Sequence, residues 1–218
     1  MPVTKVFLLG NFTMLSSWVA LIIAFVIAYS AVRIRYGKKQ GAYLLDLYFY
    51  IVIIWKLSVI ITDFSSVIRS PLSIFYFHGG TVGFYLGLAF VMGKIVVDWK
   101  KERPTIADPI ALLTAAIVSQ VVYQVMMVVL NEGELVAQVV TVSAFMSFAI
   151  LFWFSIRKAD SWPLQLTFIF MAVHVFVSAF QPKGFSETPF ITTLLIGLFF
   201  TAVLMMKNSE SQRTEEQL

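Results

Sequence analysis

Residues 108–130 have the sequence DPIALLTAAIVSQVVYQVMMVVL, and residues 135–156 have the sequence LVAQVVTVSAFMSFAILFWFSI. Apart from Asp108 at the start of the first stretch, neither contains a charged side chain. A transmembrane helix needs about 20 predominantly apolar residues, because the hydrocarbon core of a bilayer is about 30 Å thick. The two stretches therefore predict two membrane-spanning helices, joined by the short polar connection 131–134.

Five more apolar stretches of similar length occur along the chain, over residues 12–32, 44–65, 72–97, 163–182 and 189–206. The 218 residues are 59% hydrophobic and 13% charged, whereas soluble domains are about 45–50% apolar and about 25% charged. The sequence thus predicts an all-α integral membrane bundle of seven transmembrane helices over residues 1–207. Residues 208–218 are polar and aperiodic, which predicts a disordered cytoplasmic tail.

Lysine and arginine are distributed unevenly between the two sides of the predicted bundle, and cytoplasmic connections are the ones enriched in these residues. The pattern predicts a multi-pass protein with its N-terminus outside and its C-terminus in the cytoplasm. The external set is Lys5, Arg69 and Lys183. The cytoplasmic set is Arg33, Arg35, Lys38, Lys39, Lys94, Lys100, Lys101, Arg103, Arg157, Lys158, Lys207 and Arg213.

The composition excludes several kinds of chemistry. There is no cysteine, which excludes a disulfide, a thiolate metal site and a cysteine nucleophile. There are only two histidines, so a three-histidine metal site is excluded as well. The net charge of +4 follows from the cationic connections and is no signal of nucleic acid. We therefore expect no metal, no cofactor and no nucleic-acid partner.

Lys56 is an ionisable residue inside a predicted span, and such residues are costly in lipid and commonly functional. It lies near the middle of 44–65, roughly 15 Å from either end at the helical rise per residue. One hypothesis is that Lys56 binds an anionic group, such as a lipid phosphate or a substrate carboxylate. The alternative is a structural ion pair or hydrogen bonds to helix carbonyls.

His78 lies in the sequence FYFHGGTVG, residues 75–83, near the predicted outer start of the span 72–97. An imidazole there can act as a general acid or base near neutral pH. The glycines at 79, 80 and 83 allow another backbone to approach closely. The alternative is therefore an interfacial histidine beside a helix-packing glycine motif.

His174 lies at a depth similar to that of His78, about 12 Å and about 10 Å from the outer ends of their spans. The two histidines either line one cavity or make separate buried polar contacts. Gln120 and Gln124 share one face of the span 108–130, with Tyr123 beside them. These side chains are candidates for substrate binding or for ordinary interhelical hydrogen bonds.

The seven-span plan and the pattern His78-Gly79-Gly80-x-x-Gly83 resemble the bacterial prolipoprotein diacylglyceryl transferases. In that family the third helix also begins with a His-Gly-Gly motif after a proline, here Pro71. Lys56 lies where the family's second helix has an arginine.

The resemblance implies a multi-pass protein of the bacterial cytoplasmic membrane. It also implies a phosphatidylglycerol-like phospholipid substrate and a lipoprotein or other membrane partner. His78 and His174 would then be catalytic. The substrate-binding residues would be Lys56, Gly79, Gly80, Gly83, Tyr123, Gln124 and Gln181.

This chain departs from the family at the arginines that hold the phospholipid headgroup. The fourth span has Ser119 and Gln120 where the family has a Gly-Arg-x-Gly-Asn signature, and the sixth has His174, Ser178 and Gln181 at the family's charged positions. Neither histidine nor glutamine reproduces the planar donor fork of arginine. Two hypotheses follow: a divergent diacylglyceryl transferase, or a non-catalytic relative that binds lipid, lipoprotein or a membrane partner. A small-solute transporter has no paired intramembrane acids to support it.

Overall fold

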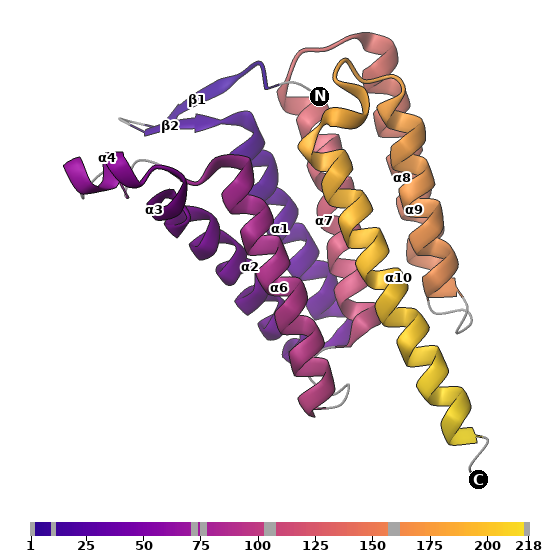
Figure 1. Ribbon diagram of the computed structural model, residues 1–218. Helices are drawn as coiled ribbons and strands as arrows, with labels where there is room; N and C mark the ends of the chain where they lie inside the picture. Colours follow the sequence, from indigo (N-terminus) through magenta and orange to yellow (C-terminus); the bar gives the residue numbers. More distant parts are fainter. Residues whose placement is uncertain are drawn as a thin grey trace. The chain divides into compact units, whose positions relative to one another are not determined.

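The computed structural model describes residues 3–9, 12–70, 74, 78–102, 108–156 and 162–215. Within these residues the chain is helical except for one β-hairpin and short connections (Figure 1). The elements in chain order are β1 (Val6–Leu9), β2 (Phe12–Leu15), α1 (Ser16–Tyr36), α2 (Lys38–Leu57), α3 (Val59–Thr62), α4 (Phe64–Arg69), α6 (Gly80–Glu102), α7 (Pro109–Leu130), α8 (Leu135–Ser155), α9 (Trp162–Ser178), η1 (Gly184–Ser186) and α10 (Thr188–Glu215).

Six of the described helices are long and apolar enough to cross a membrane: α1, α2 continued by α3, α6, α7, α8 and α10. The predicted all-α class and the multi-pass membrane character are confirmed in this form. The remaining predicted span, 163–182, corresponds to α9, an apolar helix of 17 residues.

The chain divides into two compact units, one formed by residues 33–108 and the other by residues 1–32 and 109–218. In the larger unit each of α7, α8 and α9 contacts the next helix, and α10 contacts both α9 and α7. The four helices enclose buried aromatic side chains, among which Phe148 and Phe170 stack with ring centroids 5.7 Å apart. This core positions the buried polar groups described below.

Helix α1, whose residues 16–32 belong to the larger unit, has one buried stripe and one exposed face. Ala20, Ala24 and Ala28 recur every four residues and have no exposed surface, while Val26 on another face is 59% exposed. Small side chains at this spacing allow close helix approach in a membrane. Ala20 packs in one cluster with Met127 of α7 and Ala137 of α8.

The smaller unit is built on the packing of α2 against α6. An ion pair between Lys94 and Asp98 of α6 (2.6 Å) is completed by Tyr43 of α2, whose hydroxyl donates to the same carboxylate oxygen (2.9 Å). The Lys94 ammonium also lies 5.7 Å from the ring centre of Tyr50. The charges of Lys94 and Asp98 are thus offset by each other and by aromatic side chains of α2.

The N-terminal hairpin was not predicted. The span expected over 12–32 begins instead at Ser16, and residues 12–15 form β2, which pairs antiparallel with β1 from Val6↔Leu15 to Leu9↔Phe12. The sequence between the strands is Gly-Asn, a turn signal between two runs rich in β-prone residues. These two residues, 10 and 11, lie outside the described part of the chain. Continuous hydrophobicity concealed the change from strand to helix.

Other boundaries also differ from the prediction. Helix α2 begins at Lys38 rather than at 44 and ends at Leu57, so that Lys56 lies in its last turn and not at mid-span. Helix α6 begins at Gly80 rather than at 72; Pro71 and residues 72, 73 and 75–77 lie outside the described residues. Arg103, Arg157 and Lys158 of the predicted cytoplasmic set lie outside them too.

The predicted disordered tail is helical as far as Glu215, because α10 continues through 208–215. Extending an existing helix avoids the cost of nucleating a new one. Glutamate, glutamine and arginine, which are common in this segment, are good helix formers. Residues 216–218 of the predicted tail lie outside the described residues.

Candidate functional site

The predicted site residues fall into two groups, one in each unit. Lys56, His78, Gly79, Gly80 and Gly83 belong to the unit of residues 33–108. The other group, in the larger unit, consists of Tyr123, Gln124, His174 and Gln181. Each group is described by itself.

His78 precedes α6 and packs on Trp55 near the end of α2. The two rings lie 4.4 Å apart between centroids and are tilted by 34°. The Gly80 N–H donates to His78 Nδ1 (3.0 Å), and the Trp55 indole N–H donates to the Gly80 carbonyl (2.9 Å). Because Nδ1 accepts this bond, the neutral ring carries its proton on Nε2.

The end of α2 is joined to the start of α6 through the Trp55 carbonyl. This carbonyl accepts hydrogen bonds from the Ser58 hydroxyl (2.8 Å) and from the Gly79 N–H (3.1 Å). Carbonyls at a helix end need such external partners. The His-Gly-Gly segment therefore provides a cap for α2.

The glycines of the motif are required by this packing. A Cβ atom at Gly79 or at Gly83 would overlap the Ser58 hydroxyl. Gly80 has φ +57°, a left-handed conformation that side chains rarely adopt. The motif thus has a structural explanation in close helix contact, as one of the two interpretations of the sequence expected.

Lys56 acts on His78 electrostatically. Burial, and after it the positive charge of Lys56, hold the pKa of His78 below its ordinary value of 6.5. The imidazole is therefore neutral near pH 7, as the hydrogen bond from Gly80 also requires. Lys56 and His78 are both only half-buried. A lysine ammonium and an imidazole N–H are both groups that interact favourably with anions.

His174 lies in the core of the four helices and has no exposed surface. Its Nε2 is 3.2 Å from the Gln124 amide nitrogen, and its Nδ1 is 2.6 Å from the Thr193 hydroxyl. Since an amide NH₂ only donates, Nε2 accepts and the Nδ1–H donates to Thr193. The rings of Phe145 and Phe190 meet the imidazole edge to face, at 5.1 and 5.6 Å. His174 thus links α7, α9 and α10 by a buried polar contact.

The remaining candidate residues of the larger unit also make contacts between different elements. The Gln181 amide donates to the Thr141 hydroxyl (3.3 Å), and the Gln120 amide donates to the Pro189 carbonyl (2.8 Å). Tyr123 packs against the apolar cluster that contains Ala20 and Met127. Gln120 and Gln124 are both buried, as expected for one shared helix face.

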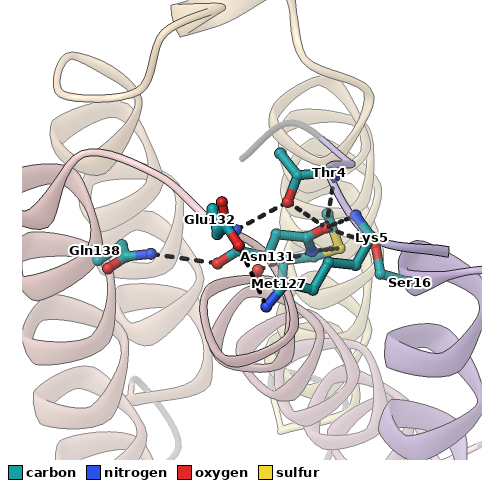
Figure 2. Close-up of polar contacts among 7 residues, drawn as sticks. All are labelled: Thr4, Lys5, Ser16, Met127, Asn131, Glu132 and Gln138. Atoms are coloured by element: carbon teal, nitrogen blue, oxygen red, sulfur yellow. Dashed lines mark hydrogen bonds and ion pairs between the residues drawn. The ribbon is translucent and has the colours of Figure 1, made fainter. Parts of the chain in front are cut away.

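Sequence reasoning missed Asn131, which it treated only as part of the short polar connection 131–134. Figure 2 shows this side chain at the centre of a polar network that joins the N-terminus to the end of α7. Its Oδ1 accepts from the Ser16 hydroxyl (2.7 Å) and from the backbone N–H groups of Thr4 (2.8 Å) and Lys5 (3.3 Å). Its Nδ2 donates to the Met127 carbonyl (3.0 Å). No local signal marks it, because Thr4 is 127 positions away in the chain.

Among the described residues, no group of three or more histidine, cysteine, aspartate or glutamate side chains is placed to hold a metal ion. No protein-family model, no curated protein and no solved structure matches the chain significantly. The contacts above therefore carry the functional argument.

Proposed function

We propose that this chain is a non-catalytic membrane protein that binds anionic phospholipid where α2 ends and α6 begins. The observation that carries the proposal is the half-buried Lys56, whose charge acts on the neutral His78 beside the first turn of α6. The N-terminus of α6 adds a partial positive charge, which favours phosphate. The ligand we propose is a phosphatidylglycerol-like lipid of the outer leaflet of a bacterial cytoplasmic membrane.

The contacts of His174 favour binding over diacylglyceryl transfer. Both of its ring nitrogens are engaged within a fully buried core, so that neither is offered to a substrate. His78 Nδ1 is likewise occupied by Gly80. A transferase would also need positioned cations, and loss of one such charge-stabilising donor costs about 3–4 kcal/mol in the transition state. A divergent diacylglyceryl transferase is the second candidate, supported by the sequence resemblance alone.

The proposed topology has seven spans with the N-terminus outside. In its support, the start of α1 contacts the end of α7 through Ser16 and Asn131. The proposed topology has four crossings from α1 to α7 and so puts these two helix ends on the same side of the membrane, in agreement with this contact. Helix α9, with 17 residues, is about 26 Å long and reaches the lower limit for a span.

Mass spectrometry of the purified protein tests this proposal. After incubation with phosphatidylglycerol and a lipobox-containing peptide, we expect bound phosphatidylglycerol and an unmodified peptide. Lys56→Gln should lower the bound lipid severalfold, whereas Lys56→Arg should retain it. The matched control Lys183→Gln removes an exposed cation in the connection after α9 and should have no effect.

Two results would contradict the proposal. A diacylglyceryl-modified peptide that disappears in His78→Ala would establish a transferase instead. Equal retention of phosphatidylglycerol and phosphatidylcholine, unchanged by Lys56→Gln, would show that the cation does not select an anionic headgroup.

A further inference from the structure

The β1–β2 hairpin presents an exposed apolar face. Side chains alternate between the two faces of a strand pair, so the register places Val6, Leu8, Thr13 and Leu15 on the same face. Val6 is 51% and Leu8 is 76% exposed, and Leu15 is exposed as well. An isolated two-stranded hairpin is only marginally stable in water. The exposed apolar face of this hairpin therefore needs to be buried against another surface.

The position of the hairpin along the chain indicates what covers it. Helix α1 begins at Ser16, directly after β2, and has 21 residues, or about 31 Å of length. This length equals the thickness of the hydrocarbon core, so Ser16 lies near its boundary. Each strand has four residues and spans only about 13 Å. The hairpin therefore stays within reach of the lipid headgroups and upper acyl chains.

Polar contacts hold the hairpin at the depth in the bilayer where α1 begins. Asn131 binds the backbone of Thr4 and Lys5 just before β1 and the hydroxyl of Ser16 just after β2 (Figure 2). The Ser16 N–H also donates to the Lys5 carbonyl (3.1 Å). Both ends of the hairpin are thus held at one point of the larger unit, near the end of α7.

The charged groups of this network mark the aqueous side. Lys5 pairs with Glu132 (3.6 Å), and these side chains are 50% and 81% exposed. The ion pair flanks the connection from α7 to α8, while the exposed face of the hairpin consists of Val6, Leu8, Leu15 and one threonine. The same short segment therefore joins a hydrated polar end to an apolar face, as in structures that lie in a membrane interface.

We propose that the β1–β2 hairpin is a lipid-interface anchor, whose Val6–Leu8–Leu15 face lies in the membrane leaflet where α1 begins and whose level is set by Asn131. The partner is the lipid surface itself, through its upper acyl chains. This inference does not depend on the proposed lipid site at Lys56, because the hairpin and Lys56 belong to different units.

Site-directed fluorescence can test this anchor, since the chain has no cysteine of its own. The full chain carrying Leu8→Cys or Thr13→Cys is labelled with an environment-sensitive dye and reconstituted into phosphatidylethanolamine–phosphatidylglycerol vesicles. We expect quenching by lipids with a nitroxide near the top of the acyl chain and protection from aqueous iodide. Glu134→Cys, in the hydrated connection, and Val26→Cys, on the exposed face of α1, are the aqueous and deep-lipid controls.

Adding Asn131→Leu to the Leu8→Cys chain tests the role of the hydrogen bonds that Asn131 makes to both ends of the hairpin. We expect lower nitroxide quenching and higher iodide quenching at Leu8, with the Val26 label unchanged. Two results would overturn the anchor: Leu8 and Thr13 labels that behave like Glu134, or labels protected from both quenchers, which would mean that a protein covers the face. Unchanged quenching in Asn131→Leu would overturn the role given to Asn131.

Discussion

His174 illustrates, at the scale of a single residue, how a buried polar contact differs from a catalytic group. The imidazole accepts from Gln124 and donates to Thr193 inside an aromatic cage, and none of its surface is exposed. Each bond satisfies a partner that would otherwise be buried and unpaired. Removing the imidazole should therefore lower the stability of the protein and have very little effect on the proposed lipid binding by α2 and α6.

We predict that His174→Leu destabilises the protein by about 1–3 kcal/mol, because Gln124 and Thr193 lose their partner in the core. Thermal unfolding in lipid nanodiscs measures the change, with Phe176→Leu on an exposed face of α9 as the control. Adding Gln124→Leu should reveal a coupling of about 0.6 kcal/mol, the average for hydrogen bonds in membranes. A His174→Leu protein as stable as the control would mean that the imidazole has no structural role.

His78 gives a prediction about pH. Its pKa is held below 6.5 by burial and by Lys56, so the folded chain binds fewer protons than the unfolded chain below that pH. Stability should therefore fall as the pH drops from the ordinary pKa of 6.5 to the lower folded value, and then level off. Protonation also removes the acceptor that Gly80 uses at Nδ1.

Unfolding temperatures measured across this pH range in the wild type and in His78→Phe would reveal the effect. The phenylalanine keeps a ring against Trp55 but does not titrate, so the decline should be smaller in the variant. Identical pH profiles for the two proteins would show that His78 does not cause the decline.

At the scale of elements, the contact between α2 and α6 depends on specific glycines. A Cβ at Gly83 would overlap the Ser58 hydroxyl and approach the Trp55 carbonyl at 3.0 Å, whereas a Cβ at Gly93 on the same helix meets nothing within 4 Å. Glycine within a helix costs about 1 kcal/mol relative to alanine. The two positions therefore separate the effect of packing from the effect of helix propensity.

We predict opposite effects for Gly83→Ala and Gly93→Ala. The first should destabilise the protein by about 1–3 kcal/mol through overpacking, while the second should be neutral or stabilise it by up to about 1 kcal/mol. Thermal unfolding of both variants in the same lipid provides the comparison. Equal behaviour of the two would argue against close packing of α6 on α2.

At the scale of the whole molecule, the number of spans decides on which side the C-terminus lies. Seven spans place residue 39 and residue 209 on one side of the membrane and residue 134 on the other. If α9 does not cross, residue 209 moves to the side of residue 134. The described helices permit both counts, because α9 has 17 residues and so reaches only the lower limit for a span.

Single cysteines at Lys39, Glu134 and Ser209 distinguish the two topologies. When an impermeant maleimide is added to intact cells, we expect it to label Glu134→Cys alone. Lys39→Cys and Ser209→Cys should be labelled only when the cells have been lysed. All three positions are exposed, so that access depends on the membrane and not on burial. Labelling of Ser209→Cys in intact cells would contradict the seven-span proposal.

The membrane-spanning character follows from the sequence because it depends on local composition. A run of about 20 apolar residues such as 109–130 must be helical in lipid, where every backbone polar group needs a partner within the segment. The expected shared face of Gln120 and Gln124 follows from helical periodicity in the same way. These features need no knowledge of what surrounds the helix.

The tertiary structure decided what the sequence left open. His174 and Gln124 are 50 positions apart, and Asn131 and Thr4 are 127 apart. Such contacts are set by which helices pack together, not by the pattern of any one of them. The hairpin and the last turn of α2 at Lys56 were likewise hidden, because uniform hydrophobicity marks a segment as membrane-embedded but does not mark where one element ends. The glycines of the His-Gly-Gly segment had two interpretations until Ser58 was found in the space that a side chain would fill.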